Sequence, residues 1–156
     1  QIFIITAKGW TVQMLASGFV FLGIFSIIGL MIGGPIVDKY NTKKVIYFTL
    51  APLFVGILTI FFFDNFFFIF VYMSCLGFSL GIGTPIVGAL WAELYGTESL
   101  GTVKALLHAL MVFFSALSPV IFGYMIDLGM GILSLCVISL FIILISTCLP
   151  LFFRNI

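Results

Sequence analysis

The stretch GGPIVDKYNTKK, residues 33–44, holds four of the eleven charged residues of this chain. They are Asp38, Lys39, Lys43 and Lys44, and they lie between two long apolar runs. Short turns rich in lysine join membrane helices and stay on the cytoplasmic side of a bilayer. The stretch therefore predicts a tight cytoplasmic turn between two membrane-spanning helices.

The composition of the whole chain agrees with this prediction. Of 156 residues, 63% are hydrophobic and only 7% are charged, and the mean hydropathy is +1.40. A soluble domain of this size needs more polar side chains to cover its surface. We expect an all-α fold, a polytopic bundle of transmembrane helices.

Five apolar segments have the length that a membrane helix requires, and short polar breaks with turn formers or helix caps separate them. The predicted spans are 12–36, 44–63, 66–91, 102–126 and 131–153. Residues 1–11 are then the remnant of a sixth helix and the loop that follows it. Because that helix would be cut, we expect the chain to be a fragment of a longer protein.

The basic residues predict the orientation of the bundle, since lysine and arginine concentrate in cytoplasmic turns. With the 33–44 turn inside, only Lys8 lies outside. The turns at Asp64 and Asp127 are then outside, and the C-terminus is cytoplasmic. The basic residues on the inner side are Lys39, Lys43, Lys44, Lys104 and Arg154.

Two of the predicted spans carry small residues at spacings of three and four, which place them on one helix face. Such faces let membrane helices approach closely. We favour packing over ligand contact for both faces. The residues are Gly18, Ser26, Gly29 and Gly33 in the first span, and Ser74, Gly77, Gly81, Thr84 and Gly88 in the third.

The sequence GIGTP, residues 81–85, predicts a kink near the middle of the third span. Pro85 cannot donate a backbone hydrogen bond to the carbonyl of Gly81, and Gly83 adds flexibility. Irregular backbone at that depth is buried in protein or lines a wet cavity. Gly81, Gly83, Thr84 and Pro85 are therefore either packing residues or candidates for a substrate cavity.

The fourth span places Lys104, His108, Ser115 and Ser118 on one stripe. A titratable side chain inside a span usually faces the bundle interior or a water-filled cavity. His108 could carry a coupling proton, but we favour a neutral His108 that is hydrogen-bonded to a neighbouring helix. Ser115 and Ser118 are further candidates for the cavity.

Several classes of function find no support in the sequence. A net charge of +1 gives no basic stripe for nucleic acid. The three cysteines lie apart in apolar runs, so we expect no disulfide, metal site or cofactor. An intramembrane enzyme would need paired acids or a nucleophile with a base at bilayer depth. A membrane scaffold or assembly subunit without transport activity remains an alternative.

Residues 34–44, GPIVDKYNTKK, resemble a signature of the major facilitator superfamily, G-x-x-x-D-[RK]-x-G-x-[RK]-[RK]. Asn41 replaces a glycine of the signature and also tolerates left-handed turn geometry. The matching positions are Gly34, Asp38, Lys39, Lys43 and Lys44.

A second stretch, residues 91–104, resembles the cytoplasmic loop between the tenth and eleventh helices of the same superfamily. Ser118, Pro119, Gly123 and Asp127 resemble the eleventh helix. The loop positions that we single out are Glu93, Tyr95, Gly96, Gly101 and Lys104.

The resemblance implies that the five spans are helices eight to twelve of a twelve-helix carrier whose N-terminal half is missing from this chain. It implies transport of a small solute by alternating access in the plasma or inner membrane, as symport, antiport or uniport, with a proton or another ion as a coupling partner. Carriers of monocarboxylates or oxalate are similar in the loops. Asp38 would then latch the inner ends of helices eight and eleven.

Overall fold

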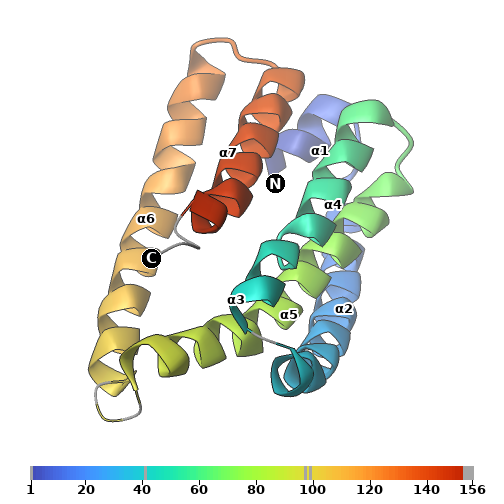
Figure 1. The fold of residues 1–156 in the computed structure, drawn as a ribbon. Helices are drawn as coiled ribbons and strands as arrows, with labels where there is room; N and C mark the ends of the chain where they lie inside the picture. The colour runs from blue at the N-terminus through green and yellow to red at the C-terminus, as the bar shows by residue number, and fades with distance from the viewer. Residues whose placement is uncertain (1, 41, 97, 99, 153–156) are drawn as a thin grey trace.

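The computed structural model describes residues 2–40, 42–96, 98 and 100–152, without the side chains of residues 2, 5, 43, 44 and 149–152. Every regular element in these ranges is helical, which confirms the all-α prediction (Figure 1). The elements are α1 (Ile2–Lys8), α2 (Val12–Lys39), α3 (Thr42–Val45), the 3₁₀ helix η1 (Ile46–Phe48), α4 (Ala51–Phe62), α5 (Phe68–Tyr95), α6 (Leu100–Asp127) and α7 (Ile132–Phe152).

Three of the described helices, α2, α5 and α6, are long and apolar enough to cross a membrane. Each has 28 residues, about 42 Å of helix. Two further apolar stretches are shorter, Ile46–Phe62 and Ile132–Cys148. The first, third and fourth predicted spans thus correspond to α2, α5 and α6, and each of these helices ends later than its span.

The second predicted span differs from the structure, because residues 42–62 form three helical pieces instead of one. The chain turns at Thr49 and Leu50, and α4 begins with Pro52 in its first turn. A proline there cannot donate to the carbonyl of Phe48, and its fixed φ suits the first turn of a helix. Pro52 therefore ends the first part of the helix and starts the second.

The closest packing in the fold is between α2 and α5. A Cβ added at Gly81 would overlap the carbonyl oxygen of Ser26, and one added at Gly77 would overlap that of Leu22. A Cβ at Gly29 would lie 2.6 Å from the carbonyl oxygen of Phe78. Only glycine lets the two backbones come this near, so the two predicted small-residue faces meet at Gly29, Gly77 and Gly81. Two members of the second face lie away from α2, because Thr84 is exposed and Gly88 lies near Lys104.

The apolar core lies along the same contact. Leu15 of α2 packs with Ile69 and Met73 of α5, and all three are buried. By contrast, α6 has no buried residue among those described, and it stands apart from α2 in Figure 1. The bundle is therefore compact around α2 and α5, whereas most of the surface of α6 is not covered by the other described helices.

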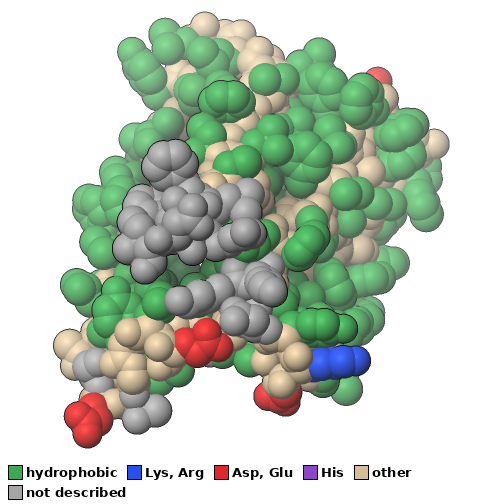
Figure 2. All heavy atoms as spheres, viewed as in Figure 1, with side chains coloured by type: hydrophobic (Ala, Val, Ile, Leu, Met, Phe, Trp, Pro, Cys, Tyr) green, Lys and Arg blue, Asp and Glu red, His purple; other side chains and the backbone are tan. Residues whose placement is uncertain are grey.

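The helix ends fall on two sides of the bundle (Figure 1). We call one side the Lys39 end: α2 and α5 end there, and α6 begins there. The opposite side, the Asp64 end, holds the turns from α4 to α5 and from α6 to α7. On the face shown in Figure 2, the surface between the ends is largely hydrophobic, and most of the charge gathers at the Lys39 end.

Candidate functional site

Asp38 lies in the last turn of α2 at the Lys39 end. Its side chain is exposed and makes no hydrogen bond or ion pair within the described part of the chain. The first turn of α6 lies beside the end of α5 instead of α2 (Figure 1). The predicted contact of Asp38 with the inner end of helix eleven, which is the start of α6, is therefore not made in this conformation.

The other residues of the 34–44 signature give this turn its local shape. The ammonium of Lys39 lies 5.6 Å from the ring centre of Tyr40. Gly34 has open space where a side chain would be. Asn41 and the side chains of Lys43 and Lys44 are outside the described structure, and so is Arg154.

A hydrogen bond joins the start of α3 to the end of α5 at the Lys39 end. The Thr42 hydroxyl donates to Oε1 of Glu93 over 2.6 Å, and Thr42 is only 1% exposed. The sequence points to Glu93 as a loop position and to Thr42 as a possible helix cap, but it does not indicate that the two are paired. The bond fixes the turn after α2 against the last turn of α5.

We expect Thr42→Val to lower the stability of the protein by about 1–2 kcal/mol, because it removes the bond to a charged acceptor and keeps the side-chain shape. The melting temperature in detergent should fall by roughly 2–8 °C. Thr84→Val is the matched control, since the Thr84 hydroxyl donates within its own helix to the carbonyl of Leu80. Equal melting of the two variants would contradict a stabilising role for the bond.

The remaining positions of the 91–104 loop shape the junction between α5 and α6. Gly96 ends α5 with a φ of 71°, a left-handed geometry that favours glycine. The rings of Trp91 and Tyr95 lie 5.9 Å apart. Gly101 is exposed in the first turn of α6, and a Cβ added at Gly88 would lie 3.9 Å from the ammonium of Lys104.

A side chain of α5 binds the backbone where the second predicted span is interrupted. The Ser79 hydroxyl is buried and donates over 2.6 Å to the carbonyl oxygen of Thr49, while the Thr49 hydroxyl donates to the carbonyl of Ile46. Irregular backbone inside a membrane needs such partners, because lipid offers none. No local pattern in the sequence indicates this pair, although Pro52 inside the apolar run is a signal for the break.

The kink residues of α5 make packing contacts. Figure 1 shows α5 changing direction as it runs toward α6. A Cβ at Gly33 would lie 2.6 Å from the ring of Pro85, so this proline packs on α2. Gly81 packs on α2 as well, whereas Gly83 faces open space and Thr84 is exposed. These contacts favour packing over substrate contact for Gly81 and Pro85.

The candidates on α6 are not brought together with those on α5. His108 and Ser115 are exposed, and within the described residues neither side chain makes a hydrogen bond to another helix. The hydrogen bond expected for His108 is therefore not made here. Ser118 is the member of this stripe that lines a cavity.

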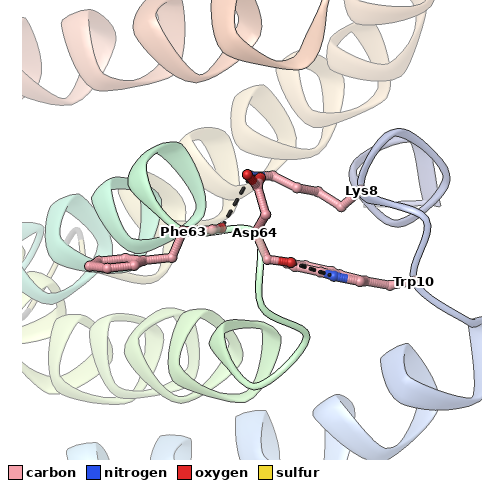
Figure 3. A network of polar contacts seen from close by, with 4 residues as sticks. All are labelled: Lys8, Trp10, Phe63 and Asp64. Atoms are coloured by element: carbon pink, nitrogen blue, oxygen red, sulfur yellow. Dashed lines mark hydrogen bonds and ion pairs between the residues drawn. The ribbon is translucent and has the colours of Figure 1, made fainter.

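A polar cluster at the Asp64 end joins the loop after α1 to the turn after α4 (Figure 3). The ammonium of Lys8 pairs with the carboxylate of Asp64 and donates to the carbonyl of Phe63 over 3.1 Å. The indole of Trp10 donates to the backbone carbonyl of Asp64 over 3.1 Å. The lone basic residue that was predicted outside thus has a structural partner.

A cavity of about 460 Å³ lies near the Asp64 end, between α1, α4, α5, α6 and α7. Its lining is mostly apolar, with Ile57 and Ile60 from α4, Phe122 and Ile126 from α6, and Leu135 from α7. None of the described residues gather into a group of three or more ligands for a metal ion. The sequence analysis did not foresee this cavity, because it forms between residues far apart in the chain.

These features define an integral membrane protein: an all-helical bundle with apolar helices of membrane length and with its charge at the helix ends. The comparison with protein families then identifies the family. The model of the Major Facilitator Superfamily matches residues 1–155, so the chain belongs to this superfamily of membrane transporters. Comparison with curated proteins and with solved structures gives no match.

Proposed function

We propose that this chain is the C-terminal part of a carrier that moves a small solute by alternating access, and that its five spans are helices eight to twelve. The observation that carries the proposal is the bond by which Ser79 of α5 holds the interrupted helix at Thr49. Interrupted helices let part of a bundle move while the rest stays packed. A scaffold would have no need for such a joint.

In this proposal the bundle has a fixed part and a moving part. The fixed part is α2 packed on α5, where glycines bring two backbones into contact. The moving part includes α6, which has no buried residue among those described. Motion of α6 toward α2 would bring its first turn to Asp38, and the positive end of the helix would attract the carboxylate.

The proposal also covers the orientation of the carrier in its membrane, its missing half and its coupling ion. The Lys39 end faces the cytoplasm of a plasma or inner membrane, because lysine-rich turns stay inside. By the same rule for basic residues, the proposal places the C-terminus in the cytoplasm. An N-terminal half completes the carrier. Groups in that half bind a proton or another ion, and the movement of this ion drives the transport of the solute.

The test of the latch is Asp38→Asn in the full-length carrier. Losing an attraction between a charge and a helix end should slow solute counterflow in proteoliposomes by roughly two- to thirtyfold. Expression and melting should stay as in the wild type, since Asp38 makes no bond to any residue that the structure describes. Asp127→Asn, an exposed acid at the other end, is the control. Unchanged counterflow for Asp38→Asn would refute the latch.

The transport proposal itself is tested by counterflow with a panel of small solutes, among them monocarboxylates and oxalate. In counterflow, a carrier accumulates labelled solute inside vesicles that are preloaded with the same solute unlabelled. A scaffold protein does not. Accumulation of at least one solute is the expected result. Absence of counterflow for the whole panel, with protein that is folded and inserted, would favour the scaffold.

A further inference from the structure

Two hydroxyl groups at the cavity near the Asp64 end have no hydrogen-bond partner among the described residues. Tyr72 of α5 and Ser118 of α6 both line it, and neither side chain makes a hydrogen bond within the described part of the chain. Among the described residues no deeply buried side-chain oxygen lacks a partner, and Tyr72 is half-buried. Because Tyr72 lines the cavity, we place the hydroxyl of Tyr72 at the surface of the cavity.

The position of the Tyr72 hydroxyl follows from how its ring is held. The ring packs against the buried core of Leu15, Ile69 and Met73. On another side it lies against Gly56 of α4, where an added Cβ would be 3.5 Å from Cδ2 of Tyr72. Because the ring is held on two sides, the Tyr72 hydroxyl has a nearly fixed position. A ligand that bonds to it loses little entropy in ordering this side chain, which favours binding.

The lining defines the polarity of a ligand. It is largely apolar and contains no charged side chain among the described residues. The hydroxyl of Ser139 also lines it but already donates to the carbonyl of Leu135 over 2.8 Å, so it offers only an acceptor. The ammonium of Lys8 is engaged with Asp64 and Phe63. A charged ligand would lose its hydration and gain no counterion.

We infer that this cavity binds an uncharged, mostly apolar molecule that carries one or two hydroxyl or carbonyl groups. Its volume of about 460 Å³ lies within the common range for small-molecule sites, about 300–1,000 Å³. The apolar body contacts Ile60, Phe122 and Ile126, and the polar group bonds to Tyr72 and Ser118. The inference concerns binding and does not depend on transport.

Occupation of the cavity also links two parts of the bundle. Ser118 and Phe122 belong to α6, whereas Ile60 and Tyr72 belong to α4 and α5. None of the described residues of α6 is buried. A ligand between these walls would therefore hold α6 to the packed part of the bundle and raise the melting temperature.

The test uses three fluorinated probes with the full-length carrier in nanodiscs at neutral pH, observed by ¹⁹F NMR. The probes are 4-fluorophenol, fluorobenzene and 4-fluorobenzoate. We expect 4-fluorophenol to bind at least about tenfold more tightly than 4-fluorobenzoate, because the carboxylate would be buried without a partner. Tyr72→Phe should weaken the binding of 4-fluorophenol by roughly two- to tenfold and leave that of fluorobenzene unchanged.

Two control variants separate the cavity from lipid and from general effects. Tyr124→Phe alters an exposed tyrosine of α6 that does not line the cavity, and it should leave all affinities unchanged. Gly123 lines the cavity and has nothing within 4 Å of an added Cβ. Gly123→Leu can therefore fill the space and should abolish the bound signal, whereas partition into lipid would persist.

Three results would overturn the inference. They are equal binding of 4-fluorobenzoate and 4-fluorophenol, unchanged binding of 4-fluorophenol in both Tyr72→Phe and Ser118→Ala, and absence of any bound signal in the folded carrier. The last result would mean that another part of the carrier fills the cavity. Counterflow is measured separately, so a failure of binding and a failure of transport are distinguishable.

Discussion

Gly81→Ala should destabilise the protein although it adds a single methyl group. The new Cβ would overlap the carbonyl oxygen of Ser26 and approach the backbone nitrogen of Leu30 within 3.0 Å. Both obstacles are backbone atoms, so α2 and α5 must separate to make room. Overpacking of this kind costs about 1–3 kcal/mol. The melting temperature in detergent should fall by roughly 2–12 °C.

Gly83→Ala is the matched control for this prediction. It lies on the same helix, two residues away, and nothing is within 4 Å of an added Cβ. Alanine is a better helix former than glycine by up to about 1 kcal/mol. Melting should therefore be unchanged or slightly higher. If both alanine variants melted alike, the close packing of α2 on α5 would be contradicted.

Ser79→Ala should weaken the joint between the interrupted helix and α5. The variant leaves the carbonyl of Thr49 without its hydrogen bond in a buried place. An unsatisfied buried acceptor costs about 1–3 kcal/mol. We expect melting to fall by roughly 2–12 °C. Counterflow should slow as well, because the interrupted helix is no longer held to α5.

Ser74→Ala is the control for the joint. The Ser74 hydroxyl donates to the carbonyl of Phe70 inside the same helix, so its loss leaves no orphaned backbone group. This variant should melt and transport as the wild type does. A Ser79→Ala protein that behaved like Ser74→Ala would show that the Thr49 carbonyl needs no partner from α5.

The sequence predicted the membrane bundle well, because length and hydrophobicity of the segments are local properties. It also predicted the small-residue faces, since spacings of three and four place residues on one side of a helix. The contacts of Gly29 with Phe78 and of Gly81 with Ser26 follow from that spacing. The family could be inferred from the 34–44 turn, where charge and glycine have a specific order.

The sequence predicted the site less well. Pro52 lies near the middle of a continuous apolar run, and the hydrophobicity of that run predicts one unbroken span. The partners Ser79 and Thr49 are 30 residues apart, and no local pattern joins them. The same holds for Thr42 with Glu93 and for the cavity lining. Such pairs depend on how helices pack, which sequence spacing alone does not determine.

The central claim is that the chain works in a carrier whose inner end closes and opens. Its most direct test is the distance between spin labels at Tyr40→Cys and Gly101→Cys in the full-length carrier, reconstituted in proteoliposomes without its native cysteines. We predict two distance populations, and Asp38→Asn should deplete the shorter one. A single long distance, the same with and without Asp38, would contradict the claim.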